Sequence, residues 1–278
     1  MALESTRRHR SNRAVSPAVS SVIITGVMVT LVTVALAFAS NFLLVRLAES
    51  EFNSGRQTMQ TLGLQVDDVA WIVGRTETVR YSSKYGGVSL WQALNYTIYV
   101  NTTTQPDWHR FYTGLTGIIS FDMPVSQYSQ GGDYFELIYP SSDGSFLFTE
   151  TSAPVARTFV VEKLPMSDGS FIRVVAAPTI RALGLSIGDT PYVRAYLPIL
   201  SQGETPGNSQ SITLTGASTS TKSIDGVTGI KIEVSFPISG FDNSFFNFPQ
   251  TVESIQLSGE TVLEVYVGEV DVAFGAHA

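Results

Sequence analysis

The sequence of 278 residues contains no cysteine and only three histidines. The lack of cysteine excludes disulfide bonds, and it excludes most zinc sites as well. Charged residues make up only 15% of the chain, and the 24 acidic residues outnumber the 17 basic ones. This balance argues against a nucleic-acid partner, because proteins that bind nucleic acids need clustered positive charge. Because the chain has no disulfide bonds, packing, oligomerisation or bound ions must stabilise it.

Charge is absent altogether from residues 14–45, which read AVSPAVSSVIITGVMVTLVTVALAFASNFLLV. About 20 apolar residues are enough for a helix to cross the hydrocarbon core of a bilayer. The few hydroxyl side chains in this stretch can hydrogen-bond to the helix's own backbone. A buried helix of a soluble domain would carry charge on at least one face. Residues 15–46 are therefore predicted to form a single membrane-spanning helix.

The charges on either side of this span predict its orientation. Residues 1–14 contain four arginines and one glutamate, whereas the part after Arg46 has 12 Lys and Arg against 23 Asp and Glu. Short basic tails stay on the cytoplasmic side of a membrane. We therefore expect a cytoplasmic N-terminus and an extracellular C-terminal part. The apolar run is roughly twice as long as the core of a secretory signal peptide, so it is not expected to be removed as one.

The residues that open the span resemble the start of archaeal type IV pilin-like proteins, in which a basic leader and a small residue precede an AVSP-type opening. Here residues 13–17 read RAVSP, and the resemblance covers residues 7–45. It implies a class III signal in which a prepilin-type peptidase reads Arg13 and cuts between Ala14 and Val15. The helix would remain on the mature protein and would assemble with other pilin-like subunits.

Two further observations accompany the resemblance. It continues more weakly through DDVAW at residues 67–71. Bacterial type IV pilins carry a glutamate at the fifth mature position, where this chain offers only Ala18 or Val19. Independently of any family, a proline preceded by serine is a favourable helix start, because the serine caps the helix and the missing N–H of proline is not needed there.

Small residues along the same helix would let a second helix approach closely, as in a membrane or a filament core. They are Ala18, Ser21, Thr25 and Gly26.

Apolar residues continue at intervals of three, four or seven over residues 47–74, which predicts an amphipathic extension of the helix that stops near Gly74. Residues 53–55 interrupt the pattern and are a candidate kink. The apolar positions are Leu47, Phe52, Met59, Leu62, Val66, Val69 and Ile72 or Val73.

From residue 75 the hydrophobic period changes to two, which predicts a β-rich extracellular domain over residues 75–278 with a candidate subdomain boundary at 201–209. Residues 76–81 and 88–91 are expected to form a hairpin, and residues 178–185 a short helix. Many short strands at roughly ten-residue spacing favour an antiparallel β-sandwich, so the fold class is α+β. Further strands are expected at 95–101, 117–122, 133–139, 145–151, 157–164, 170–177, 191–199, 210–216, 227–236, 251–257 and 261–274, with a turn at Ser258-Gly259.

Candidates for catalysis or metal binding are few. His109 lies beside Asp107 and Trp108, but no nucleophile motif accompanies it, which favours a surface-loop or hydrogen-bonded histidine. Asp67 and Asp68 would point about 100° apart on a helix, so we expect them to face solvent or cap it rather than to act as a pair. Asp-Gly at 143–144 and 168–169 lacks the EF-hand spacing and favours turns over calcium sites. The sequence therefore predicts no catalytic residue, cofactor or metal, and no enzyme.

Two other features concern the surface. Asn95 and Asn101 each begin an Asn-X-Thr sequon, and at six residues apart on one strand they would face the same way. They are either N-glycosylation sites of an exported domain or ordinary asparagines. A run of phenylalanines, at positions 236, 241, 245, 246 and 248, favours a loop tucked into the core over an exposed patch that contacts a neighbouring subunit.

Three functional hypotheses follow. The first is a structural subunit of an archaeal type IV pilus-like surface filament, major or minor, assembled through its N-terminal helix. The second is a membrane-anchored extracellular adhesin or ligand-binding module that uses a pilin-type signal without polymerising. The third, an anchored enzyme, requires a cluster of acids or partners around His109 that the sequence does not provide.

Overall fold

The structure is a computed structural model, and it describes residues 17–140, 144–151, 153–163, 170–203 and 210–275. The predicted leader and processing site, with Arg13, Ala14 and Val15, lie outside the described residues. So do Asp143 and the expected turn at residues 168–169.

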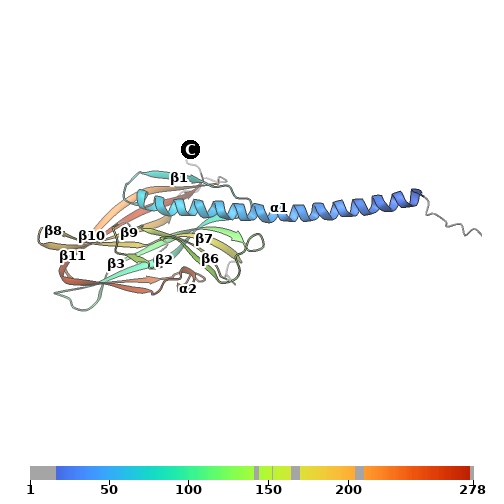
Figure 1. The fold of residues 1–278 in the computed structure, drawn as a ribbon. Coiled ribbons are helices and arrows are strands. Elements are labelled where there is room, and N and C mark those ends of the chain that lie inside the picture. The colour runs from blue at the N-terminus through green and yellow to red at the C-terminus, as the bar shows by residue number, and fades with distance from the viewer. Residues whose placement is uncertain (1–16, 141–143, 152, 164–169, 204–209, 276–278) are drawn as a thin grey trace, which may run out of the picture. The chain divides into compact units, whose positions relative to one another are not determined.

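A long helix, α1 (Pro17–Ala70), precedes a domain that consists mostly of strands (Figure 1), which confirms the α+β class. The chain divides into two compact units, Met1–Leu47 and Ala48–Ala278. The remaining elements are β1 (Thr76–Arg80), β2 (Gly87–Thr102), β3 (His109–Pro124), β4 (Tyr134–Tyr139), β5 (Leu147–Phe148), β6 (Ala156–Glu162), β7 (Phe171–Pro178), β8 (Ile180–Ile187), β9 (Thr190–Gln202), β10 (Ser211–Ser235), α2 (Asn243–Phe246) and β11 (Val252–Phe274).

The described strands form one sheet in the order β4-β6-β7-β3-β2-β10-β11-β9-β8-β5, with β1 paired to β10. β11 pairs with β9, and β5 with β8, in parallel. The other pairings among the described strands are antiparallel. The expected sandwich of two sheets is not confirmed, because the strands belong to a single sheet.

The part of α1 from Ala48 onward packs on one face of this sheet. The α1 side chains Phe52, Met59, Leu62, Val66 and Val69 are all at most 2% exposed, at spacings of three, four and seven that place them on one helix face. They form a core with apolar residues of β3, β7, β10 and β11. The helix continues through residues 53–55, and it ends at Ala70 rather than near Gly74.

The C-terminal end of α1 lies so close to β11 that only glycine fits at the point of contact. A Cβ atom on Gly268 would lie 2.2 Å from the carbonyl oxygen of Ala70 and 3.0 Å from the ring of Trp71. Ala70 is the last residue of α1 and Trp71 follows it. The contact with Ala70 is to backbone, so the added atom could be accommodated only if the end of the helix moved.

A second core fills the opposite side of the sheet, which bends around it. β10 and β11 pair over most of their length, but the register shifts near Gly216, Ile224 and Val227. Such bulges bend strands and increase their twist, and Figure 1 shows both long strands curving. As a result, the first part of β10 packs against α1, whereas Ile230 and Ile232 belong to the second core.

The bend brings β3 and β9 together, although they are far apart in the strand order. The hydroxyl of Thr116 in β3 donates to the carbonyl of Pro198 at 3.2 Å and accepts from the N–H of Leu200 at 2.9 Å. Gln92 adds a bond from its amide to the carbonyl of Leu200 at 3.1 Å. Side-chain hydrogen bonds therefore join β9 to β2 and β3, which are not its neighbours in the strand order.

Three local predictions were wrong. The hairpin of residues 76–81 and 88–91 does not form, because β1 pairs with β10 and β2 pairs with β3 and β10. Residues 178–185 are not helical but lie mostly in β8, where Ile180 and Ala182 alternate into the second core. The turn at Ser258-Gly259 is instead an interior part of β11.

The contact at Gly268 generates the first prediction. Gly268→Ala should lower the free energy of unfolding by about 1–3 kcal/mol or more, because the added methyl group must displace the end of α1. Gly184→Ala is the matched control, since a Cβ atom there meets nothing within 4 Å. Thermal unfolding of the detergent-solubilised chain, followed by circular dichroism, checks this. Equal melting temperatures for the two variants would contradict it.

Candidate functional site

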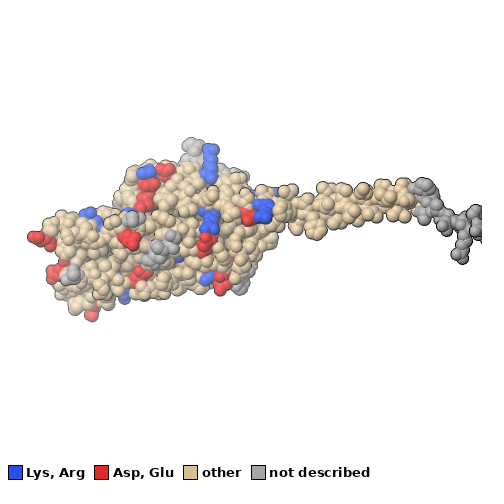
Figure 2. Space-filling view, viewed as in Figure 1, with Lys and Arg blue, Asp and Glu red and all other residues tan. Residues whose placement is uncertain are grey.

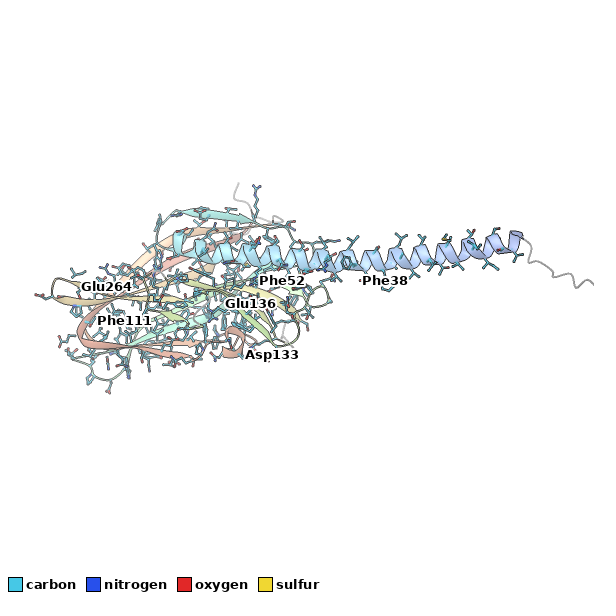
Figure 3. The ribbon with its side chains drawn as sticks, viewed as in Figure 1. Phe38, Phe52, Phe111, Asp133, Glu136 and Glu264 are labelled. Atoms are coloured by element: carbon cyan, nitrogen blue, oxygen red, sulfur yellow. The ribbon has the colours of Figure 1, made fainter. Side chains whose placement is uncertain are left out.

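The first candidate element is the apolar part of α1. Its large apolar side chains from Val19 to Leu47 are 47–74% exposed. The sequence from Val19 to Val45 has no Lys, Arg, Asp or Glu, and Figure 2 shows this length of the helix without charged side chains up to its end at the domain. Figure 3 shows Phe38 projecting from it. Within the described residues, α1 is the one helix long and apolar enough to cross a membrane, judged by length and composition.

Three threonine hydroxyls of this apolar part are satisfied within the helix. The hydroxyls of Thr25, Thr30 and Thr33 each donate to the carbonyl four residues earlier, at 2.8–2.9 Å. A helix that satisfies its own polar groups can lie in hydrocarbon without leaving hydrogen bonds unmade.

Past this apolar part, Glu51 joins α1 to the loop between β1 and β2. The residue is 8% exposed, and its carboxylate accepts hydrogen bonds from the hydroxyl of Ser83 and from the backbone N–H groups of Tyr85 (2.8 Å) and Gly86 (2.9 Å). Burial raises the pKa of Glu51, but the bonds from Ser83 and the loop backbone outweigh it, so the net pKa is lowered. Phe121 presses on the same loop, since a Cβ atom on Gly86 would lie 2.5 Å from its ring.

Two more polar contacts fix α1 to the sheet. Arg56 pairs with Glu136 of β4, with Nη1 3.0 Å from Oε2, and Tyr134 donates to the same carboxylate. Farther along, Asp67 accepts from the indole of Trp71 at 2.7 Å and from Arg181 of β8 at 2.9 Å.

Asp67 is therefore not the solvent-facing or capping residue that the sequence predicted, because it forms an ion pair with the sheet. Asp68 does face solvent, with 63% of its side chain exposed.

The second candidate site is a pocket with aromatic walls, which we call the aromatic pocket. It lies beside the loop that Glu51 holds, across the paired ends of β2, β3 and β7, where Gly87 opposes Asp122 and Asp122 opposes Arg173. Its volume is about 480 Å³. It is lined by Tyr85, Gly86, Gly87, Ser89, Trp91, Asp122, Pro124 and Phe171.

An ion pair lies at the floor of the aromatic pocket. Arg173 is fully buried and its Nε donates to Asp122 at 2.9 Å, while Asp122 is 9% exposed. The guanidinium also lies 5.1 Å from the ring centre of Phe171. In the wall, the indole N–H of Trp91 donates to Ser120 at 3.2 Å. The floor is thus polar with balanced charge, and the walls are apolar rings.

A second cavity, of about 380 Å³, opens between the β8–β9 hairpin and β11. Gly184, Tyr192, Ile255, Leu257 and Thr261 are among its lining residues. Its lining residues carry mostly hydroxyl and aliphatic side chains, and Tyr192 is the single aromatic residue among them.

The sequon asparagines both lie on β2 and face away from the second core. Their neighbours Leu94, Tyr96, Ile98 and Val100 point into that core. Asn95 donates to Ser235 at 3.3 Å, and Asn101 accepts from Thr228 at 3.1 Å.

His109 is the remaining catalytic candidate among the described residues. His109 begins β3, and its ring nitrogen lies 3.4 Å from the backbone carbonyl of Asp107. Among the described residues, no group of three or more His, Asp or Glu side chains forms a metal-binding cluster.

The phenylalanine run is part of the second core. Phe241, Phe245, Phe246 and Phe248 are at most 6% exposed, so the core prediction is confirmed and an exposed patch is wrong. Asp242 caps the short helix α2 by accepting from the N–H of Phe245 at 2.8 Å.

Comparisons of the chain with protein-family models, with curated proteins and with solved structures found no match. Its function must therefore be argued from its own residues.

Sequence reasoning missed both the polar contacts of α1 and the aromatic pocket. The contacts left a signal, because Glu51 and Arg56 are charges within an otherwise weakly charged helix. The pocket left none, since Trp91, Asp122 and Phe171 come from three strands that only the sheet register brings together.

Glu51 generates a prediction about pH. Its pKa is lowered by folding, so its contribution to stability is full above the unfolded pKa of about 4.3 and is lost as the pH falls through the folded pKa. Glu51→Gln should destabilise the chain at pH 7, because hydrogen bonds to a charged group contribute about 1.5–3 kcal/mol. It should also flatten the decline in melting temperature between about pH 5 and pH 3.

Glu260→Gln, at an exposed position, serves as the control and should leave the pH profile unchanged. Melting temperatures of the three proteins, measured at half-unit pH intervals, test this prediction. A Glu51→Gln profile parallel to that of the unsubstituted chain would show that the carboxylate carries no such linkage.

Proposed function

We propose that the chain is a structural subunit, major or minor, of an archaeal type IV pilus-like surface filament. The observation that carries the proposal is the apolar part of α1, with large side chains 47–74% exposed, preceded in the sequence by RAVSP. Apolar surface of this extent needs lipid or other apolar helices as its surroundings. A pilin-type subunit uses both in turn, lipid before assembly and neighbouring subunits afterward.

In this proposal the basic leader lies in the cytoplasm, α1 spans the membrane and the β-rich domain is extracellular. A prepilin-type peptidase reads Arg13 and cuts between Ala14 and Val15. Asn95 and Asn101 then lie on the side where N-glycosylation takes place. The charge difference between the leader and the remainder supports this orientation.

The alternative is an anchored extracellular adhesin or ligand-binding module that is exported in the same way but does not polymerise. The aromatic pocket favours it, because a purely structural subunit has no need of such a cavity. The missing glutamate at Ala18 or Val19 favours it too.

The signal is tested through the N-terminal residue of the mature protein. In an archaeal host with its prepilin peptidase, mass spectrometry should find a start at Val15. Arg13→Ser should leave the precursor uncut, whereas Arg7→Ser, the same change farther from the site, should be processed normally. An intact leader on the unsubstituted chain would rule out the prepilin proposal and leave a plain single-span protein.

Polymerisation is tested separately at Gly26, where a Cβ atom meets nothing within 4 Å. Gly26→Leu keeps the span apolar but prevents a second helix from approaching closely, so cleavage and membrane insertion should persist while sheared filaments disappear. Val29→Leu, a similar increase in bulk at a residue that is already large, is the control. If the unsubstituted chain is cleaved but never appears in sheared material, the anchored module is the better description.

A further inference from the structure

We propose that the aromatic pocket is a binding site for a neutral polyhydroxylated ligand, such as a monosaccharide or the terminal sugar of a glycan. This goes beyond a structural role, and it holds whether or not α1 polymerises, because every lining residue belongs to the unit Ala48–Ala278.

The walls supply flat apolar surfaces. Tyr85, Trp91 and Phe171 line the cavity together with Pro124. Aromatic rings offer large apolar faces, and the C–H face of a sugar ring can pack on them. The rings are held by neighbours: Trp91 packs against Phe241 with ring centres 5.6 Å apart, and Arg173 lies over Phe171.

The floor supplies hydrogen-bonding groups of the kind that sugar hydroxyls need. Asp122 and Ser89 line the cavity, and both can accept a hydrogen bond, while the serine hydroxyl can also donate. A sugar hydroxyl likewise donates and accepts. A few polar groups among mostly apolar walls are typical of small-ligand sites, and a volume of about 480 Å³ falls within their usual range.

The charges of the floor argue against an ionic ligand. Asp122 is bound to Arg173 at 2.9 Å, so its negative charge is already balanced, which weakens the attraction for a cation in the aromatic walls. An anion would likewise lose its hydration at the floor without meeting a net positive charge. A neutral ligand meets neither penalty.

The loop that forms one wall is fixed from the helix side. Glu51 accepts from the N–H groups of Tyr85 and Gly86, so the wall is in place before a ligand arrives. A preformed site spends less binding energy on ordering the protein.

Gly87 provides a way to fill the aromatic pocket without straining the fold. It lines the cavity, and a Cβ atom there meets nothing within 4 Å. Gly184 is the matched position, since it lines the second cavity and is equally open. Leucine at either position therefore blocks one cavity and leaves the other free.

The experiment uses the full chain with 5-fluorotryptophan at its three tryptophans, in a detergent without a sugar headgroup. Single Trp→Phe variants assign the three fluorine resonances. Glucose, galactose, mannose and N-acetylglucosamine are titrated to about 50 mM, which covers millimolar dissociation constants. At least one sugar should shift the Trp91 resonance saturably while Trp71 and Trp108 stay unchanged.

Gly87→Leu should weaken this binding at least about tenfold, which corresponds to 1.4 kcal/mol, and Gly184→Leu should leave it unchanged. Matching melting temperatures of the two variants confirm that both are folded. Saturation-transfer NMR on the sugars gives a second readout that needs no fluorine. The proposal is overturned by no saturable response to any of the four sugars, by a response that Gly184→Leu removes instead, or by saturable shifts with choline or sulfate alone.

Discussion

Burial of one face of α1 against the sheet is the contact on which the β-rich domain depends. Five large side chains of the helix contribute to a core to which β3, β6, β7, β9, β10 and β11 also contribute, and the helix end meets β11 without room for a Cβ atom. Glu51, Arg56 and Asp67 add polar bonds along the same length of helix. Removing the helix would expose this face of the sheet, so the helix is an integral part of the domain.

The two parts of α1 differ in what surrounds their apolar side chains. From Ala48 onward most of these side chains lie on the face that packs on the sheet, whereas before Ala48 they are exposed and need another environment. The pilus-like and anchored-module proposals both follow from this contrast, and they differ only in what provides that environment. The aromatic pocket belongs to the β-rich domain alone, so it bears on what the domain binds rather than on how the chain is held.

The sequence predicted the elements that depend on local periodicity. The long helix, its buried face and most strands follow from apolar spacings of 3.6 and 2 residues. The pairing of β1 with β10 could not be predicted, because its partners are about 135 residues apart and the loop between β1 and β2 is held by Glu51. The aromatic pocket is hidden for the same reason, since the register of three strands creates it. Asp67 was misjudged because its partner, Arg181, is 114 residues away.

The position of β11 bears on the order in which such a domain forms. β11 pairs with β10 on one side and with β9 on the other, so the last strand of the described chain lies inside the sheet rather than at its edge. Residues of β11 enter both cores. A chain that is made with its earlier strands first cannot close either core until residues 252–274 have followed. Folding of the domain therefore waits for the last described strand, and a chain that lacked it would present the open edges of β9 and β10.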